Sequence, residues 1–351
     1  MSAAALARPE IRALDAYAPA RQESGMLRLN ANEASWTGDG AQGLNRYPPA
    51  RPRELHEQLA ALYGVAADNL LATRGSSEAI DLLVRAFCRP GADSILVTPP
   101  TFGMYRVYAA IQGARLVTAP LEEARDFAFD AGRALGACED ATKLVFLCSP
   151  NNPTGGLVSE ADVLRLARAR HGRSLVVVDE AYVEFSGAPS LARKAAESCN
   201  LVVLRTLSKA LALAGARCGA VIGPADVIRL LDGLLAPYAL ARPVIDCVRH
   251  ALTPPNLERA EAAARAVIAE RERLAAALAA SPLVQRVWAS RGNFLLVRFA
   301  RPARARASLR EQGILVREFD DAALQGCARI TIGAPDENER LLGALAAEAP
   351  A

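Results

Sequence analysis

Hydrophobic positions between residues 46 and about 240 follow two alternating patterns. Stretches such as "PRELHEQLAALYG" and "SSEAIDLLVRAFC" place apolar residues at helical spacing. Short apolar runs bounded by turn residues lie between such stretches and predict strands. The predicted strands cover residues 94–100, 114–120, 143–150, 174–182, 200–206 and 218–224.

Most of these predicted strands are continuous apolar runs rather than alternating ones, as in "SLVVVDEAY" and "NLVVLRT". Strands that are buried on both faces have this composition. Helices on both sides of a mostly parallel sheet provide such burial, so the sequence predicts an α/β fold with the sheet sandwiched by helices.

The hydrophobic pattern changes after about residue 240. Residues 255–281 form one long helical pattern, followed by shorter predicted strands in "NFLLVRF", "ILVRE" and "CARITIG" and a helix in "ARARASLREQG". These elements predict a smaller α/β unit at the C-terminal end. We therefore divide the chain into a large domain (46–245), a small C-terminal domain (246–351) and an N-terminal arm (1–45) that is expected to contribute to the small domain and the active site.

Composition and charge argue against several classes of protein. The 351 residues are 52% hydrophobic and 23% charged, which is typical of a folded globular chain rather than a disordered one. A net charge of +3 without a basic cluster argues against nucleic acid as a partner. The three histidines are far apart and give no metal-ligand spacing, so no metal site is expected.

The start of the chain and the cysteines indicate a cytoplasmic location. "MSAAALARPEIRALD" is interrupted by Arg8 and Glu10 too early for a signal peptide. No apolar run approaches the length of a membrane span, so no membrane partner is expected. The seven scattered cysteines form no C-x-x-C pair, which indicates a reducing compartment.

One glycine motif is a false match to a nucleotide-binding fingerprint. Gly38, Gly40 and Gly43 in "GDGAQG" fit the pattern G-x-G-x-x-G. That fingerprint needs a strand before it and a helix after it, whereas irregular sequence lies on both sides here. We interpret these residues as a flexible loop.

Polar or aromatic residues follow the ends of four predicted strands. "SILVTPP" leads into "TFGMY", "VFLCSP" into "NNPTGG", "LVVVD" into "EAY" and "LVVLRT" into "LSK". In an open parallel sheet, ligands bind beyond the carboxyl ends of the strands. The side chains expected to gather on this rim are those of Phe102, Asn152, Asp179, Tyr182 and Lys209.

This arginine-rich chain has only three lysines, Lys143, Lys194 and Lys209. Lys143 directly precedes a predicted strand and Lys194 lies on a predicted helix among polar neighbours, so both are interpreted as solvated charges. Lys209 alone follows a strand end and is flanked by hydroxyl residues. Lysine forms Schiff bases with carbonyls, and a desolvated lysine is a better nucleophile.

The residues at the strand ends fit the needs of pyridoxal phosphate. This cofactor requires a lysine, an aspartate near a cationic ring nitrogen, an aromatic face and donors to the ring oxygen. Its phosphate needs donors as well. Gly75, Ser76 and Ser77 lie at a predicted helix start, where free N–H groups favour an anion. Further phosphate donors are Thr206, Ser208 and Arg217.

Together these motifs resemble the fold-type I pyridoxal-phosphate-dependent aminotransferases, and within them the histidinol-phosphate aminotransferase branch. The motifs that carry the resemblance are "LNRYPP", "SPNNPTG", "VVDEAYVEF" and "RTLSKALALAGARCG". The match extends over nearly the whole chain through "PPTFGMY", "GNFLLVRF", "GILVRE" and "ARITIG". The N-terminal "RALDAYAPA" and "LNANE" favour the histidinol-phosphate branch.

The resemblance implies a role in cofactor binding for each matched residue. Lys209 would hold pyridoxal 5′-phosphate covalently, and Asp179 would pair with its ring nitrogen. Phe102, where many relatives have tyrosine, would stack on the ring, and Asn152 and Tyr182 would bond the ring oxygen. The phosphate would be held by Ser76, Ser77, Thr206, Ser208 and Arg217, with Tyr47 reaching over from the second subunit of a homodimer.

For the substrate, the resemblance points to Tyr17, Asn32, Arg317 and Arg329. The planar fork of arginine binds phosphate or carboxylate through two hydrogen bonds, so two arginines suit a substrate phosphate. Arg329 would also hold the carboxylate of glutamate. Because arginine is the default cation of this chain, the alternative that Arg317 or Arg329 is a solvated strand-edge charge stays open.

The sequence therefore predicts reversible amino transfer between histidinol phosphate and 2-oxoglutarate, which gives imidazole acetol phosphate and glutamate. The catalytic residues would be Lys209, as general base and acid, with Asp179 and Tyr182. A threonine-phosphate decarboxylase or a broader aromatic aminotransferase would share the fold and cofactor. A cofactor-binding regulatory protein is disfavoured, because no basic helical segment precedes residue 45.

Overall fold

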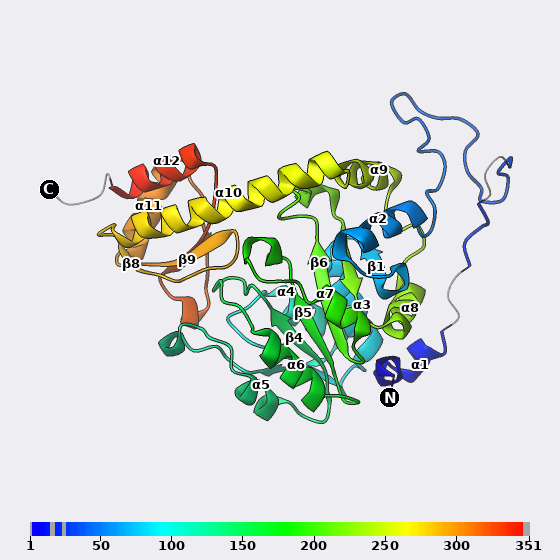
Figure 1. The fold of residues 1–351 in the computed structure, drawn as a ribbon, viewed down its shortest axis with the longest axis horizontal. Helices are drawn as coiled ribbons and strands as arrows, with labels where there is room; N and C mark the ends of the chain where they lie inside the picture. The colour runs from blue at the N-terminus through cyan, green and yellow to red at the C-terminus, as the bar shows by residue number, and fades with distance from the viewer. Residues whose placement is uncertain (1, 15–17, 23–25, 347–351) are drawn as a thin grey trace.

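The computed structural model describes residues 2–14, 18–22 and 26–346 of the chain. Figure 1 shows a large sheet with its helices, a smaller C-terminal sheet and the long helix α10 (Pro254–Ala279), which runs along both. The two sheets and their connection by one helix set the position of the candidate site.

The large sheet has the strand order β1-β7-β6-β5-β4-β2-β3. Strands β2 to β6 run parallel to one another, whereas β7 is antiparallel to both β6 and β1. The predicted mostly parallel sheet is therefore confirmed. The strands are β1 (Leu70–Thr73), β2 (Ser94–Val97), β3 (Arg115–Thr118), β4 (Thr142–Cys148), β5 (Leu175–Asp179), β6 (Leu201–Thr206) and β7 (Gly219–Ile222).

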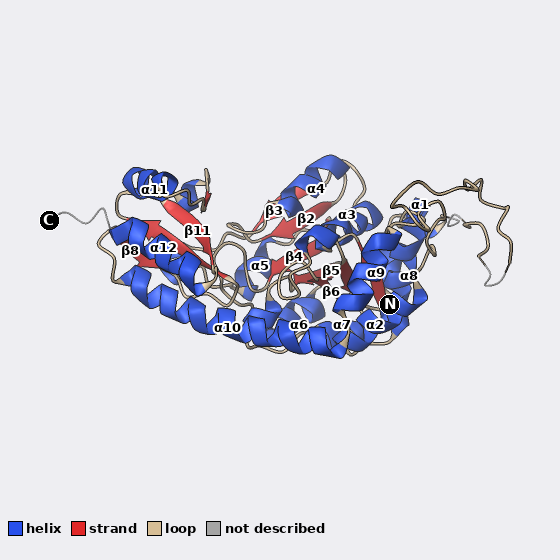
Figure 2. Ribbon diagram, turned by 90° about the horizontal axis from the view of Figure 1, so that it is seen from above, coloured by secondary structure: helices blue, strands red, loops and turns tan. Residues whose placement is uncertain are grey.

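Helices cover both faces of the large sheet (Figure 2). One layer contains α2 (Arg53–Tyr63), α5 (Ala131–Ala137), α6 (Glu160–Ala169), α7 (Ala192–Glu197) and α9 (Arg242–Ala251). The opposite layer contains α3 (Ser76–Phe87), α4 (Met104–Gln112) and α8 (Ala225–Leu234). Side chains alternate along a strand, so Val176 and Val178 of β5 face the first layer and Leu175 and Val177 the second. This explains the uninterrupted apolar sequence of β5.

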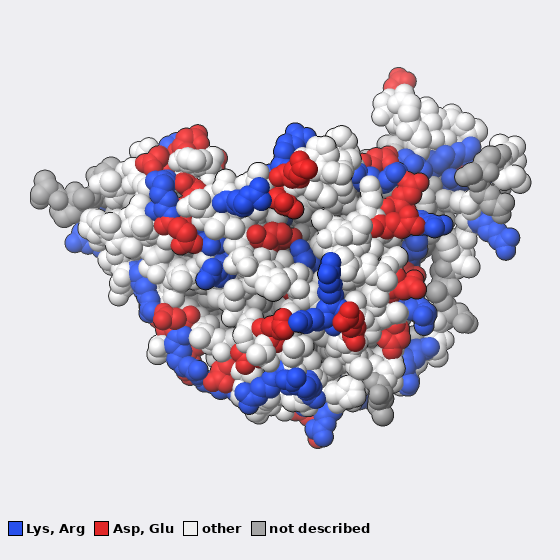
Figure 3. Space-filling view, in the orientation of Figure 1, with Lys and Arg blue, Asp and Glu red and all other residues white. Residues whose placement is uncertain are grey.

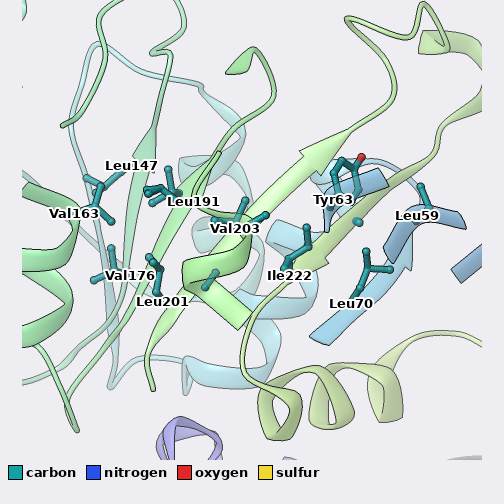
Figure 4. Close-up of a cluster of buried hydrophobic side chains, with 14 of the residues drawn as sticks. Leu59, Tyr63, Leu70, Leu147, Val163, Val176, Leu191, Leu201, Val203 and Ile222 are labelled. Atoms are coloured by element: carbon teal, nitrogen blue, oxygen red, sulfur yellow. The ribbon is translucent and has the colours of Figure 1, made fainter. Parts of the chain in front are cut away.

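The core of the first layer joins elements that are far apart in the sequence. Leu59 and Tyr63 of α2 share a buried cluster with Leu70 of β1 and Ile222 of β7 (Figure 4). Burial of each such aliphatic side chain contributes about 1.5–3 kcal/mol to stability. These contacts hold α2 against the β1 edge of the large sheet.

The C-terminal sheet is antiparallel, with the strand order β10-β11-β9-β8. One face packs on the second half of α10 through Leu274 and Leu278, and on two shorter helices. The strands are β8 (Val284–Val287), β9 (Phe294–Phe299), β10 (Arg317–Glu318) and β11 (Cys327–Thr331), and the helices are α11 (Pro302–Glu311) and α12 (Pro335–Ala346).

Arg271 of α10 ties the two sheets together from inside the protein. Its side chain is 2% exposed, and Nη1 donates to the carbonyl oxygens of Phe185 and Gly292, both at 2.9 Å. Phe185 lies shortly after β5, and Gly292 lies just before β9. The buried guanidinium therefore fixes the C-terminal sheet relative to the loop that follows β5.

The structure differs from the sequence prediction at several strands. The sequence analysis did not predict β1 or β8, each of which is four residues long. The strand expected in "ILVRE" shrinks to the two residues of β10. Lys143 lies within β4 rather than before it. Short strands such as β1 depend on a distant partner, here β7, so their local pattern is weak.

The start of the chain packs on the large sheet's helices. A 3₁₀ turn at Ala3–Leu6 and helix α1 (Pro9–Arg12) lie against α8, where Ala3 and Ala7 are buried. Residues 2–14 thus contact the large part of the chain, and the expected contribution of residues 1–45 to the small domain stays a prediction. Residues 26–47 form no helix or strand, and this segment lies at the opposite end of the molecule from the C-terminal sheet (Figure 1).

Basic and acidic side chains are interspersed over the face of the molecule shown in Figure 3. Several are paired, as Lys194 is with Glu160 at 2.8 Å. All seven cysteines are free. Within the described part of the chain, no helix has the length and apolar character needed to cross a bilayer.

Candidate active site

The carboxyl ends of β4, β5 and β6 and the N-terminal end of α3 surround a cavity of about 150 Å³. All predicted cofactor-binding residues except Tyr47 line it. They are Ser76, Ser77, Phe102, Asn152, Asp179, Tyr182, Thr206, Ser208, Lys209 and Arg217, joined by Cys148, Ala181 and Ala214. The strand-end rim predicted from the sequence is thus one continuous site.

Lys209 lies in the loop that connects β6 to β7, with its Nζ 5.7 Å from the centre of the Tyr182 ring. The pKa of Lys209 is lowered from its ordinary value, chiefly because the surrounding protein removes water from the amine. Repulsion by Arg329 and Arg217 lowers this pKa further, while Asp179 opposes the shift. A lower pKa increases the unprotonated fraction of the amine, which is the nucleophilic form.

Asp179 is the last residue of β5 and is 2% exposed. Its Oδ2 accepts a hydrogen bond from the Tyr105 hydroxyl at 2.9 Å, and its Oδ1 accepts from the Ala181 backbone N–H at 3.2 Å. Burial nevertheless raises the pKa of Asp179 to about 6, against the lowering effect of these donors and of Lys209. A cationic group placed in the cavity would stabilise the ionised carboxylate.

Asn152 links the opposite wall of the cavity to the C-terminal sheet. Its Nδ2 donates to the Tyr182 hydroxyl at 3.2 Å, and its Oδ1 accepts from Nη1 of Arg329 at 2.5 Å. Burial raises the pKa of Tyr182, so its hydroxyl stays protonated at neutral pH. The Asn152 amide and Tyr182 hydroxyl are therefore available as neutral hydrogen-bonding groups.

The C-terminal sheet supplies the arginines beside this wall. Arg329 lies over the ring of Phe294, 5.5 Å from its centre, and Phe294 meets Tyr182 edge to face at 5.1 Å. Arg317 of β10 pairs directly with Arg329 of β11, and directly opposed residues project from the same face. Burial lowers the pKa of Arg329 and so does Arg317. Two adjacent guanidinium groups on one face favour an anionic ligand.

Hydroxyls and Arg217 converge at the start of α3. The Thr206 hydroxyl donates to the Ser208 hydroxyl at 2.9 Å, and Arg217 Nη1 lies 3.4 Å from the same oxygen. Gly75, which precedes α3, has a φ of +81°, and a Cβ there would lie 2.9 Å from Arg217 Nη2. The absence of a side chain lets the guanidinium approach the free N–H groups of Ser76 and Ser77. Such an arrangement binds phosphate.

Two predicted site residues lie elsewhere, and a third is not among the described residues. Tyr47 stacks on Tyr238 with ring centres 4.6 Å apart, and its backbone N–H donates to Glu33. Asn32 lies in the same N-terminal arm, and neither Asn32 nor Tyr47 lines the cavity. Tyr17 lies outside the described residues.

Sequence reasoning assigned no role to Tyr105, Cys148 or Phe294. Tyr105 contacts Asp179, Cys148 lines the cavity, and Phe294 supports both Tyr182 and Arg329. Tyr105 and Phe294 belong to the motifs "PPTFGMY" and "GNFLLVRF", so their motifs were noted. Their contacts to residues between 35 and 112 positions away have no local signature.

Comparison with known proteins shows the family to which this chain belongs. Residues 28–345 match the family described as aminotransferase class I and II. A histidinol-phosphate aminotransferase of Stenotrophomonas maltophilia is 48% identical over 350 residues, which covers 98% of this chain and 96% of that protein. A histidinol-phosphate aminotransferase of Escherichia coli is 42% identical, covering 98% of this chain and 97% of that protein.

Solved structures show the same fold. The histidinol-phosphate aminotransferase of Sinorhizobium meliloti, crystallised in complex with pyridoxal-5′-phosphate, superposes with a TM-score of 0.78 at 25% identity. The superposition covers 86% of this chain and 82% of that one.

Proposed function

We propose that this chain, which belongs to the family of class I and II aminotransferases, transfers the amino group between histidinol phosphate and 2-oxoglutarate. The products are imidazole acetol phosphate and glutamate. One observation carries the proposal. Lys209, Asp179 and the phosphate cradle, formed by Ser208 and Arg217, surround one cavity, and Arg329 and Arg317 lie beside it. The names of relatives at 42–48% identity over nearly the full chain support the choice of substrate.

The cavity fits pyridoxal 5′-phosphate, the cofactor of this family. A Cβ at Gly75 would occupy the approach of Arg217, and among the described residues the buried Asp179 carboxyl accepts hydrogen bonds only from the neutral Tyr105 hydroxyl and Ala181 backbone N–H. Lys209 would hold the cofactor's carbonyl carbon, Phe102 its ring, Asp179 its ring nitrogen, and Ser208 with Arg217 its phosphate. When bound, the cofactor receives the amino group and accepts the electron pair released at the substrate Cα.

The chain's own residues then divide the remaining work. The Nζ of Lys209, once free, takes the proton from the substrate Cα, and its lowered pKa increases the unprotonated fraction that can do so. Asn152 and Tyr182 orient the reacting group through the amide and hydroxyl that face the cavity. Arg329 binds the substrate's anionic group, and the same arginine serves glutamate in the reverse half-reaction.

A paired assay tests the reaction. Purified protein is incubated with histidinol phosphate and 2-oxoglutarate, and glutamate is measured. A second vessel contains threonine phosphate, and released carbon dioxide is measured; a third contains aromatic amino acids with 2-oxoglutarate. Glutamate from histidinol phosphate at the highest kcat/KM is the expected result. Carbon dioxide without glutamate would replace the proposal by a decarboxylase, and equal rates with aromatic amino acids by a broader aminotransferase.

We further propose that the site is completed by a second copy of the chain. Large apolar side chains of the N-terminal arm are exposed, among them Leu29 at 84% and Trp36 at 71%. Exposed apolar groups of this density mark a protein interface. Asn32 and Tyr47 lie in this arm, away from the cavity of their own chain. In a homodimer, the arm would bring Tyr47 to the partner's phosphate cradle, with Asn32 and Tyr17 near the substrate.

Complementation tests this arrangement. Lys209→Ala and Tyr47→Ala chains carrying different tags are co-expressed, and the heterodimer is purified through both tags. One of its two sites then has both native residues, so it should regain about half of the wild-type activity. Activity no higher than that of the two parent homodimers would show that Tyr47 acts within its own chain.

We also infer a cytoplasmic location and the division into a large part (46–245) and a small part (246–351). The seven free cysteines support a reducing compartment. The two separate sheets and their separate cores support the division. Fractionation of the source cells and limited proteolysis near α9 test the two statements.

A further inference from the structure

Tyr105 places a buried hydroxyl directly behind the Asp179 carboxylate. Its side chain is 0% exposed, although tyrosine has a polar end. The ring stacks on Phe146 of β4, with centres 4.8 Å apart and planes 14° apart, and meets Phe102 edge to face at 5.6 Å. Tyr105 thus has one fixed orientation, determined by rings on two sides.

The Tyr105 hydroxyl interacts with two side chains, those of Asp179 and Cys148. It donates to Oδ2 of Asp179 at 2.9 Å, while Oδ1 accepts from the Ala181 backbone N–H. Burial and the neighbouring Asp179 raise the pKa of Tyr105 well above its ordinary value, so the hydroxyl keeps its proton at any working pH. It remains a donor throughout the reaction. Each carboxylate oxygen therefore accepts one hydrogen bond from the protein, while the Asp179 side chain lines the cavity.

Other groups around Asp179 do not substitute for this donor. The Cys148 thiol lies beside Asp179 with its pKa raised by burial, and its Sγ donates to the Pro150 carbonyl oxygen at 3.3 Å. Lys209 faces the carboxylate from the cavity side, and Tyr182 donates no hydrogen bond to it. Among the described residues, Tyr105 is the one side chain that donates a hydrogen bond to Asp179.

We propose that Tyr105 is a positioning residue, whose hydroxyl holds the Asp179 carboxylate ionised and aimed at the ring nitrogen of the cofactor. The proposal rests on the cofactor assignment made above and deepens it. Phe102 connects the two functions, because the ring that would stack on the cofactor also packs against Tyr105. One side chain would thereby set the position of the carboxylate and support the stacking ring.

Tyr105→Phe tests the proposal, because it removes the hydroxyl and keeps the ring packing. Without this donor the Asp179 carboxylate becomes more basic, and the proton shared with the ring nitrogen moves toward the oxygen. The ring then carries less positive charge, so the nitrogen that joins it to Lys209 keeps its proton to higher pH. The midpoint of the visible absorbance titration of the bound cofactor should therefore rise.

The second readout is the dissociation constant of pyridoxamine 5′-phosphate, measured by equilibrium dialysis. This form has no covalent bond to Lys209, so its affinity reports the non-covalent contacts alone. Loss of a buried hydrogen bond to a charged group should weaken binding at least about tenfold. Neither readout requires a substrate, so both remain informative if the choice of histidinol phosphate is wrong. A wild-type protein that binds no cofactor would instead refute the proposed function.

Tyr63→Phe is the matched control. Tyr63 is also buried, and its hydroxyl has no hydrogen-bond partner in the described structure (Figure 4). The change removes the same atom from a core tyrosine that does not touch Asp179. It should leave both the titration midpoint and the dissociation constant at wild-type values.

Should Tyr105→Phe fail to fold, 3-fluorotyrosine at position 105 keeps the hydroxyl and makes it a stronger donor. The titration midpoint should then fall, the opposite direction to that expected for phenylalanine. An unchanged midpoint in the fluorinated protein overturns the proposal. Wild-type affinity and midpoint in a folded Tyr105→Phe protein overturn it as well, since the hydroxyl would then only satisfy a core hydrogen bond.

Discussion

Nη1 of Arg329 donates a hydrogen bond of 2.5 Å to the side-chain oxygen of Asn152, and this contact joins the C-terminal sheet to the loop after β4. The bond directs the Asn152 amide nitrogen toward the Tyr182 hydroxyl. Within the described part of the chain, the arginine's other N–H groups have no hydrogen-bond partner and can meet an anion. We therefore expect this one residue of β11 both to orient the Asn152 amide and to bind the substrate.

Replacement of Arg329 should affect both half-reactions. Arg329→Gln removes the charged fork, and KM for glutamate and for 2-oxoglutarate should rise about 100-fold, as expected for loss of a charge-assisted bond pair. Arg317→Gln is the matched change on the neighbouring strand. It should raise KM only for the phosphorylated substrate, because Arg317 is the more exposed of the two. Stopped-flow measurement of each half-reaction separates these effects; equal effects of the two variants on glutamate would contradict the assignment.

Replacement of Lys209 by arginine should abolish amino transfer while preserving the charge. Arginine stays protonated and forms no stable bond with a carbonyl, so activity should fall about 10³-fold or more. Borohydride treatment followed by peptide mass analysis should find the cofactor fixed on Lys209 in the native protein and nowhere in Lys209→Arg. Lys194→Arg, which changes an exposed lysine paired with Glu160, is the control. Labelling of Lys143 or Lys194 in the native protein would refute the assignment.

Asp179 should make the cofactor-free protein less stable as pH rises. Its pKa is about 6 in the folded state and about 3.9 in an unfolded chain, so the folded state binds the extra proton between those values. Stability from this group is then present below pH 4 and is lost as pH rises through 6, at a cost of about 3 kcal/mol.

Asp179→Asn removes that dependence. The free energy of unfolding of the cofactor-free variant, measured in urea, should exceed the wild-type value by up to about 3 kcal/mol at pH 8 and match it near pH 4. Asp140→Asn, which removes an exposed carboxylate, should cause little change at either pH. A variant less stable than wild type at pH 8 would show that the hydrogen bonds to Asp179 outweigh the cost of burying its charge.

Arg271 should hold the two sheets together. Arg271→Ala leaves the carbonyl oxygens of Phe185 and Gly292 without their buried donor and opens a void, so stability should fall by about 3 kcal/mol. Arg273→Ala, two residues further along α10, removes exposed ion pairs with Glu270 and Glu339 and should cause little change. Thermal unfolding of both variants measures the difference. Equal losses of stability in the two variants would show that the substitutions act on helix α10 itself rather than on the buried contacts of Arg271.

The hydrophobic pattern alone predicts the division of the chain into two α/β units, because the elements with the clearest pattern lie in both units. Val176 to Val178 in β5 and the 26 residues of α10 are each recognisable because their local sequence has no competing interpretation. β1 and β8, each four residues long, were not predicted, although the equally short β2, β3 and β7 were. Burial of β1 depends on β7, which lies about 150 residues further along the chain.

By itself the sequence predicted which residues carry the chemistry. Lys209, Asp179, Asn152 and the Ser208–Arg217 segment stand at strand ends, and parallel strands place such ends on one rim whatever the details of packing. Only the tertiary structure decided how those residues are supported. The hydrogen bonds from Tyr105 to Asp179 and from Arg329 to Asn152 span 74 and 177 positions. The local sequence also does not indicate that Tyr47 lies away from the cavity of its own chain. Side-chain contacts of this range depend on how helices and sheets pack, which no short stretch of sequence encodes.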